Sequence, residues 1–332
     1  MTVMTTALHD PRPLSAPAFA AARRGSRGDV ALQRTLKSPI RCAGIGLHSG
    51  ARAEMVLKPA QANTGIVFRR IEPTGRSVDI AASWQNVVDT RMCTRIGLPG
   101  GPSVAMIEHL MAALAGSEID NALIEIEGPE VPVMDGSSAP FMFLIECAGT
   151  VEQSAPRRAL KIIKEIEVGT PDKLVRLGPS ATPTISYDID FDSPVIRRQQ
   201  AEMKFINGTF KSEISRARTF GFLHELDQLR AAGLARGGSL DNAVVVTADG
   251  VMNEGGLRYD DEFVRHKMLD AVGDLYLAGG PILGRFHGHR SGHHLHHAAL
   301  VQLFADPSAW RWVEIPAVAA AAVVDGRFAA TA

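Results

Sequence analysis

The sequence predicts an α+β protein in which β-sheets are layered against a few helices. Short alternating or apolar segments with strand character occur in runs, and helical segments interrupt them without the strict alternation of a doubly wound sheet. With 332 residues, the chain is longer than one core usually needs, so we expect two domains. Because no tandem repeat is obvious, we expect the halves to resemble each other only in architecture.

The first half contains strand-like segments separated by turn signals. These segments are AEMVLKP, TGIVFRR, ALIEIEG and LKIIKEIEV. Two helices are expected among them, near 104–115 and around 138–148. Gly116 ends the first helix, and Pro140 lies in the first turn of the second, where proline is tolerated.

A similar pattern returns in the second half, beyond a boundary that we place near 155–160. The expected elements are strands near 160–168, 173–178, 184–190 and 201–206, a helix, a strand at 243–247, a helix at 261–278 and a terminal strand near 298–304. The predicted parts of the chain are a disordered N-terminal extension (1–32), a first α+β domain (33–156), a second α+β domain (157–315) and an Ala-rich tail (316–332).

Bulk composition is that of a globular protein, with 45% hydrophobic and 21% charged residues. A formal net charge of -1 argues against a general nucleic-acid-binding protein. The three cysteines, Cys42, Cys93 and Cys147, lack CxxC spacing and suit a reducing compartment, so we expect a cytoplasmic protein. The N-terminal stretch is a poor signal peptide, with a mitochondrial-type presequence as the weaker alternative, and no apolar run is long enough to span a bilayer.

One helical segment, FVRHKMLDAVGDLYL, places His266, Asp270 and Asp274 four residues apart on one polar stripe. Burying an imidazole and a carboxylate together costs several kcal/mol unless something compensates them. A divalent metal ion is one such compensation. The alternative is a partly exposed helix in which the histidine and the aspartate form a hydrogen bond.

A second candidate is the adjacent pair Glu108 and His109 on the first expected helix. The pair superficially resembles part of the HExxH zinc-protease motif, but Ala113 is incompatible with that motif. If His109 binds a metal, the His266 and Asp270 pair supplies suitable further ligands and leaves an open position for water. Glu108 could then accept a proton from that water. The alternative is an ordinary surface pair.

Residues 287–297 contain six of the eleven histidines. Their spacing fits no single helical or strand face, so we expect most of them to lie in a solvated loop. One of them, His293, could act as a catalytic acid if Asp274 accepts a hydrogen bond from it and keeps it protonated.

Two further candidate features precede the helix expected at 261–278: a threonine and a row of leucines. Thr219 could donate a hydrogen bond to a developing oxyanion, although a threonine in a strand is usually structural. Leu223, Leu226 and Leu229 recur at helical spacing, and this stripe is either part of the core or the wall of a lipid-contacting groove.

Several ordered motifs together resemble one enzyme family. They are GIGLHSG, NTGIVFRR, IEHLMAALAG, IDNALIEIEGPEVPVMDGSSAPF, ISRARTFGF, GLRYDDEFVRHKMLDAVGDL and SGHHL. This set is similar to the UDP-3-O-acyl-N-acetylglucosamine deacetylases of lipid A biosynthesis, and the similarity runs from about Gln33 to residue 305. The resemblance implies a zinc amidase of two similar α+β domains, each a sheet layered against two helices, with the active site at their interface.

The resemblance also implies a role for each matching residue. The implied zinc ligands are His109, His266 and Asp270, with iron as the alternative metal in cells. The implied catalytic residues are Glu108 as general base, His293 as general acid, Asp274 as its orienting partner, and Thr219 and Lys267. Thr219 and Lys267 would also contact the substrate, while Phe220 and Gly238 would line the sugar and nucleotide pocket, and the segment 222–238 would form an apolar passage for the acyl chain.

The implied reaction is hydrolysis of the acetamide of UDP-3-O-acyl-N-acetylglucosamine, the committed step of lipid A biosynthesis. We expect a monomer with transient membrane-surface contact at most. Two other classes stay open from the residues alone. One is another zinc amidohydrolase or a peptidase, and the other is a non-catalytic protein that binds a sugar nucleotide or a metal.

Overall fold

The computed structural model describes residues 30–205 and 208–317. Most of the expected N-terminal extension (1–32) and Ala-rich tail (316–332) therefore lies outside the described residues. Where the two segments are described, they meet: Val30 forms a β-bridge with Pro316, and the Ala31 backbone N–H donates to the Ile315 carbonyl at 2.8 Å.

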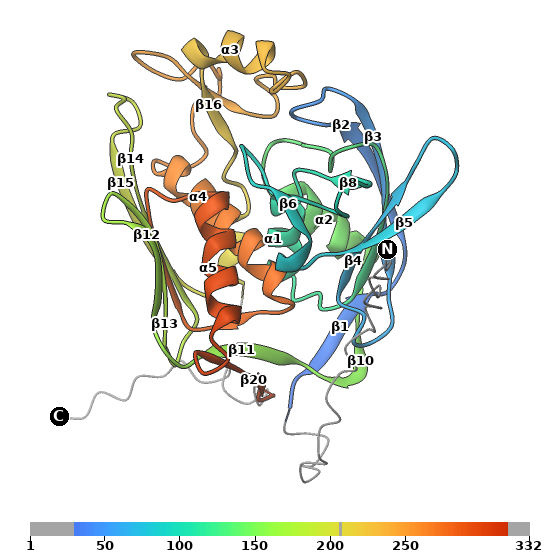
Figure 1. The fold of residues 1–332 in the computed structure, drawn as a ribbon. Coiled ribbons are helices and arrows are strands. Elements are labelled where there is room, and N and C mark those ends of the chain that lie inside the picture. The colour runs from blue at the N-terminus through green and yellow to red at the C-terminus, as the bar shows by residue number, and fades with distance from the viewer. Residues whose placement is uncertain (1–29, 206–207, 318–332) are drawn as a thin grey trace, which may run out of the picture.

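Two five-stranded sheets form the outer layers, and helices lie between them (Figure 1). The first sheet has the order β2 (Ile40–Ile45), β3 (Arg52–Pro59), β9 (Ala122–Glu127), β4 (Ile66–Ile71) and β5 (Ser77–Ala81). The second has the order β12 (Ile166–Thr170), β13 (Lys173–Gly178), β19 (Arg285–His289), β14 (Thr184–Asp190) and β15 (Arg198–Lys204).

The two sheets share one topology. In each, the third and fourth strands of the order, β9 with β4 and β19 with β14, are parallel, and the other neighbours are antiparallel. The fourth and fifth strands form a hairpin, β4 with β5 and β14 with β15. The expected α+β fold with two architecturally similar halves is confirmed.

Four longer helices fill the middle of the molecule. They are α1 (Glu108–Gly116), α2 (Ala139–Ala148), α4 (Glu262–Leu275) and α5 (His293–Ala305). Helices α1 and α4 come from different halves and pack against each other. The two helices approach closely at Gly273, where a Cβ atom would lie 2.0 Å from the Glu108 carbonyl oxygen. Any other residue at this position would force the two helices apart.

Shorter elements connect these layers. The small sheets consist of β1 (Leu32–Leu36) with β10 (Thr150–Pro156), β11 (Arg158–Ile162) between β18 (Ile282–Leu283) and β20 (Trp310–Glu314), β6 (Val87–Asp89) with β7 (Arg95–Gly97) and β8 (Ser103–Val104), and β16 (Phe220–Phe222) with β17 (Val244–Val246). Between β16 and β17 the chain forms the short helix α3 (Leu226–Ala231). The remaining single turns are Trp84–Asn86, Phe210–Ile214, Leu223–Glu225 and Tyr276–Ala278.

Three expected elements differ from the structure. The first helix begins at Glu108 and not near 104, because Ser103 and Val104 pair with β7. The expected strand at 160–168 is two strands, β11 and β12. The expected terminal strand near 298–304 is wrong, because this segment belongs to α5. A short apolar run fits either structure, and here its buried residues lie at helical spacing.

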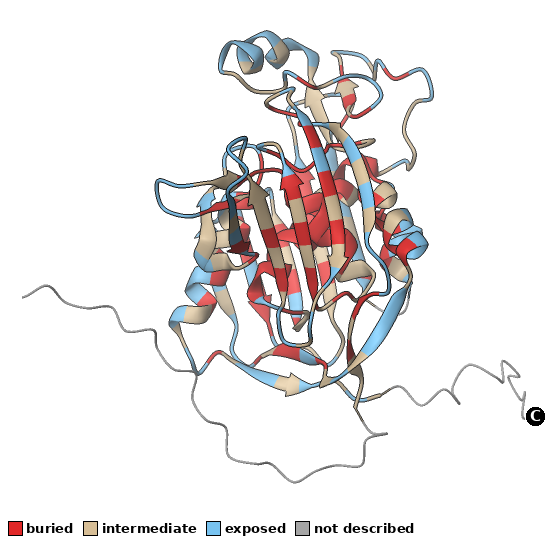
Figure 2. Ribbon diagram, turned by 90° about the vertical axis from the view of Figure 1, so that its right-hand side faces the viewer, coloured by how far each residue is buried: buried red, intermediate tan, exposed pale blue. Residues whose placement is uncertain are grey.

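Buried residues are concentrated on the inner faces of the layers and on the helices, whereas the rim loops are exposed (Figure 2). Strand β3 shows the alternation clearly, with Ala53, Met55 and Leu57 buried and their neighbours more exposed. Helix α1 is buried along most of its length, which fits its position between layers. Among the described residues, none of the helices is long and apolar enough to cross a membrane.

Candidate active site

Helix α4 presents the polar stripe that the sequence predicted. His266, Asp270 and Asp274 lie one turn apart and are 2%, 2% and 3% exposed. Leu269 and Val272, on the other sides of the helix, are buried in the core. The expected alternative of a partly exposed helix is therefore wrong, because these polar groups lie inside the protein.

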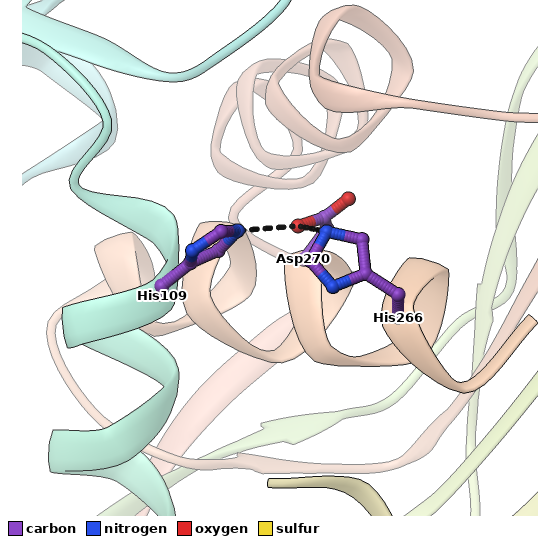
Figure 3. A group of neighbouring side chains, drawn as sticks. All are labelled: His109, His266 and Asp270. Carbon is purple, nitrogen blue, oxygen red and sulfur yellow. Dashed lines mark ion pairs between the residues drawn. The ribbon is translucent and has the colours of Figure 1, made fainter. Parts of the chain in front are cut away.

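The first group of polar residues joins both halves of the chain. His109 of α1 points toward His266 and Asp270 of α4 (Figure 3). The Asp270 Oδ1 atom lies 3.6 Å from His109 Nε2 and 3.3 Å from His266 Nε2. The His266 Nδ1–H donates to the Ala217 carbonyl oxygen at 3.1 Å, which leaves Nε2 of that ring free to bind a metal. We call these three residues the metal triad.

The metal triad fits a metal ion on three observations. First, two ligands of a tetrahedral zinc ion lie about 3.3 Å apart, close to the separations seen here. Second, the buried Asp270 Oδ1 atom has no hydrogen-bond partner among the described residues. Third, burial lowers the pKa of His266 to about 4 and so favours the neutral imidazole that metals require.

Glu108 lies at the start of α1, directly before His109, and is 1% exposed. Its Oε2 atom accepts a hydrogen bond from the Thr94 backbone N–H at 3.0 Å. Burial raises the pKa of this carboxyl to about 7. A carboxylate with this pKa can accept a proton near neutral pH and release it again.

A second group of polar residues surrounds Asp274. Its Oδ2 atom lies 2.8 Å from His293 Nδ1 and 2.7 Å from His296 Nδ1, and its Oδ1 atom accepts a hydrogen bond from Thr94 Oγ1 at 2.5 Å. We call these residues the Asp274 cluster. Burial opposes the charged imidazole of His293, but the Asp274 carboxylate outweighs burial and raises the pKa of His293 to about 9.

The expectation of a solvated histidine loop at 287–297 is wrong. His287 and His289 lie on β19 and face Asp188, whereas His293 and His296 lie one turn apart on α5 and are 9% and 0% exposed. The segment spans the end of a strand and the start of a helix. Its histidines therefore follow no single periodicity.

A cavity of about 450 Å³ opens beside the metal triad. It is lined by the predicted residues Glu108, His109, Thr219, Phe220, Gly238, His266, Lys267, Asp270 and His293. Asp274 lies behind His293 and does not line it. Lys267 is not free, because its Nζ atom donates to Asp270 Oδ2 at 2.6 Å.

The leucine stripe also lines this cavity. Leu226 and Leu229 of α3 are partly buried, and Leu223 is 43% exposed. Of the two alternatives for the stripe, the structure supports an apolar groove and contradicts a core position. The stripe belongs to the chain between β16 and β17, which lies at one end of the molecule (Figure 1).

Three residues of the site were missed by sequence reasoning. Thr94 contacts both Glu108 and Asp274, and no local pattern marks it. His296 could have been found from its i+3 spacing to His293. His48 lines the cavity, is 7% exposed, and its Nε2 atom has no hydrogen-bond partner within the described ranges. Its loop is held by Glu130, which accepts hydrogen bonds from the backbone N–H groups of His48 and Ser49.

Comparison with known proteins agrees with this geometry. Residues 33–305 match the family model described as UDP-3-O-acyl N-acetylglycosamine deacetylase. A UDP-3-O-acyl-N-acetylglucosamine deacetylase of Acidithiobacillus ferrooxidans is 50% identical over 284 residues, which cover 85% of this chain and 93% of that protein. Enzymes of the same name from Cellvibrio japonicus and Xanthomonas axonopodis pv. citri are each 47% identical, over 85% and 86% of this chain and 93% and 94% of their own lengths. The chain belongs to the UDP-3-O-acyl-N-acetylglucosamine deacetylase family of metalloenzymes.

Proposed function

We propose that this protein hydrolyses the acetamide of UDP-3-O-acyl-N-acetylglucosamine and releases acetate and UDP-3-O-acyl-glucosamine, as a step of lipid A biosynthesis. The observation that carries the proposal is the position of the metal triad, with Glu108 and His293 beside it, in a cavity whose other wall is lined by leucines. Family membership supports the same reaction. A cytoplasmic location and a monomeric state stay predictions from the sequence.

The cofactor that we infer is a zinc ion held by His109 Nε2, His266 Nε2 and Asp270 Oδ1. Two imidazoles and one carboxylate are a common ligand set of catalytic zinc, which keeps a further position open. The same set also binds Fe²⁺ in other enzymes, so metal analysis must decide between them. When bound, the ion supplies Lewis-acid polarisation of the acetamide carbonyl and of a water molecule.

Glu108 is the general base in this proposal. Its buried carboxylate takes a proton from the attacking water, and its raised pKa of about 7 matches that task near neutral pH. The Thr94 backbone N–H fixes Oε2, so the carboxylate faces the cavity in one orientation. Oxygen of the water then bonds to the acetamide carbon.

His293 is the general acid. An amide anion is too basic to leave, so the nitrogen of the substrate must be protonated as the C–N bond breaks. Asp274 accepts the Nδ1–H of His293, and the opposite nitrogen, Nε2, is then the one that delivers the proton. The hydroxyl of Thr219 and the Nζ atom of Lys267 are the donors that we assign to the carbonyl oxygen as it gains charge.

The two ends of the substrate fit different walls of the cavity. Leu223, Leu226 and Leu229 offer an apolar surface for the acyl chain. Phe220 and Gly238, which also line the cavity, are assigned to the sugar and nucleotide. Because acyl and nucleotide groups lie at opposite ends of the substrate, both contacts are needed to place the acetamide at the metal triad.

The direct test is deacetylation of purified UDP-3-O-acyl-N-acetylglucosamine, with metal content measured on the same sample. We expect one equivalent of zinc and one acetate released for each UDP-3-O-acyl-glucosamine formed. A matched control is UDP-N-acetylglucosamine, which lacks the acyl chain and should react far more slowly. Hydrolysis of peptides or of unrelated acetamides at a comparable rate, or the absence of acetate release, would contradict the proposal.

A further inference from the structure

Asp274 accepts more hydrogen bonds than the orientation of His293 requires. The Nδ1 atoms of His293 and His296 both lie within 2.8 Å of Asp274 Oδ2, and Thr94 Oγ1 donates a hydrogen bond to Asp274 Oδ1. An ionised carboxylate can only accept hydrogen bonds, so each of the two imidazoles must carry its proton on Nδ1. His296 is 0% exposed and does not line the cavity, so it acts on the reaction only through its neighbours.

The distances show that the Asp274 cluster is a hydrogen-bond network and not a second metal site. Two ligands of one zinc ion lie about 3.3 Å apart, as in the metal triad. In the Asp274 cluster the nitrogen-to-oxygen distances are 2.8 and 2.7 Å, which are ordinary for charge-assisted hydrogen bonds. No ion fits between atoms that are already bonded in this way.

The ring of His296 is itself held from the side of the second sheet. Its Nε2 atom lies 3.2 Å from the hydroxyl of Tyr187, a residue of β14. That hydroxyl donates to the Ser291 carbonyl at 2.6 Å and accepts a hydrogen bond from Ser291 Oγ at 2.7 Å. The ring also packs edge-on against Phe286, with centroids 5.7 Å apart. His296 is thus the link between the Asp274 carboxylate and the second sheet.

We propose that His296 is a positioning residue for the deacetylation. Its Nδ1–H keeps Asp274 in the rotamer in which Oδ2 faces His293, and His293 is thereby held with Nε2 as its proton-donating atom. The inference rests on the function proposed above. Without this donor, Oδ2 keeps one of its two hydrogen bonds and the carboxylate can turn about its Cβ–Cγ bond toward Thr94.

Several other titratable groups surround the same carboxylate and the two imidazoles. They are Glu108 on α1, Lys267 and Asp270 on α4, Tyr187 on β14 and His48 in the loop after β2. None of them is altered in sequence when only His296 is changed. His296→Asn and His296→Leu both remove the contact of Nε2 with Tyr187, so the difference between these two variants isolates the Nδ1 donor.

Two variants of matched shape test the proposal. In His296→Asn the amide Nδ2 takes the place of Nδ1, since both atoms are bonded to Cγ, so the donor to Asp274 is kept. In His296→Leu a methyl group takes that place and the donor is lost at similar volume. Both are measured in the zinc-loaded full chain, with the melting temperature and metal content as checks on folding.

We expect His296→Leu to lower kcat about 10-fold with KM and zinc content unchanged, and His296→Asn to recover most of that loss. A second readout needs no turnover: the downfield proton resonance of His293 Nδ1–H, assigned by its loss in His293→Ala, should persist in His296→Asn and shift in His296→Leu. Equal kcat values in the wild type and His296→Leu, or equal losses in the two variants, would overturn the inference.

The outcomes also separate this inference from the proposed function. A wild-type protein that releases no acetate contradicts the function. If the wild type is active but His296→Leu changes neither the rate nor the His293 resonance, only the role of His296 is contradicted. If His296→Leu does not fold, Tyr187→Phe provides the same test one step further out, with a smaller expected loss of kcat and a smaller shift of the same resonance.

Discussion

Two groups, each with one aspartate and two histidines, are built around Asp270 and Asp274, which lie one helical turn apart on α4. The groups differ in how their polar atoms are paired. In the metal triad, Asp270 Oδ1 stays 3.3 and 3.6 Å from the two imidazoles and has no hydrogen-bond partner among the described residues. In the Asp274 cluster, every carboxylate oxygen is within hydrogen-bond distance of a donor.

Residue type alone therefore does not identify a metal site. Both groups hold three buried side chains that could bind an ion. The unpaired oxygen and the wider spacing of the metal triad leave room for a cation, whereas the short contacts of the Asp274 cluster are already complete. In our proposal, one group therefore holds the metal and the other orients the proton donor.

The largest effect is expected from His109→Ala, which removes a ligand from the metal triad. We expect loss of bound zinc and a fall in deacetylation of more than about 100-fold, since even partners behind a ligand change activity 10- to 100-fold. The measurement is zinc content together with kcat/KM. The control is His289→Ala. His289 belongs to the same histidine-rich segment but pairs with Asp188, outside both groups, so this variant should keep its zinc and its activity. Stoichiometric zinc in His109→Ala would mean that the triad is not the metal site.

Glu108→Gln should leave zinc in place and remove the base. The amide has similar shape but cannot accept a proton, so we expect kcat to fall by about 10²- to 10⁴-fold. Zinc content and the melting temperature, measured beside the wild type, serve as controls for binding and folding. Activity within a few-fold of the wild type would exclude the role that we assign to Glu108.

Asp274→Asn tests the other group, with an expected loss of kcat of about 10-fold or more and no loss of zinc. The Asp274 carboxylate favours the charged form of His293 against the effect of burial, and the pKa of His293 is raised to about 9. The protonated acid is therefore depleted only at high pH in the wild type. A neutral amide lowers that pKa, so the alkaline limb of the pH–rate profile should move to lower pH. An unchanged limb would show that His293 is not the titrating acid.

The smallest effect is expected outside both groups, at the leucine stripe. Leu229→Ser removes apolar surface from the cavity wall and should raise KM for the acylated substrate up to about 10-fold, because a buried leucine contributes about 1.5 kcal/mol or more. Zinc content and the pH profile should stay as in the wild type. An equal change for a substrate without an acyl chain would argue against a groove for that chain.

Local sequence patterns were enough to predict the site residues that lie together on helix α4. The four-residue spacing of His266, Asp270 and Asp274 placed all three on one face, and α4 has them there. That His109 joins them was suggested by ligand chemistry, and the convergence itself appears only in the packing of α1 on α4. The resemblance to a known family supplied the roles of the remaining residues.

Other features depend on contacts that no local pattern encodes. Thr94 touches Asp274 across 180 positions of sequence, and nothing around it distinguishes it from other loop threonines. The prediction of a strand near 298–304 was wrong because a short apolar run fits the periodicity of a helix as well as that of a strand. Packing on α4 and on the second sheet selects the helix. The shared topology of the two sheets is likewise visible only in the pairing of strands.

The contact of Gly273 with the Glu108 carbonyl has a consequence for how such proteins change over evolutionary time. The spacing between α1 and α4 is set by backbone against backbone at this point, with no side chain between them that could be exchanged for a larger or smaller one. Substitutions elsewhere in the interior can therefore accumulate in either half while the ligands contributed by the two helices keep their separation. We expect the surrounding layers to accommodate such changes while this contact fixes the distance between the two helices.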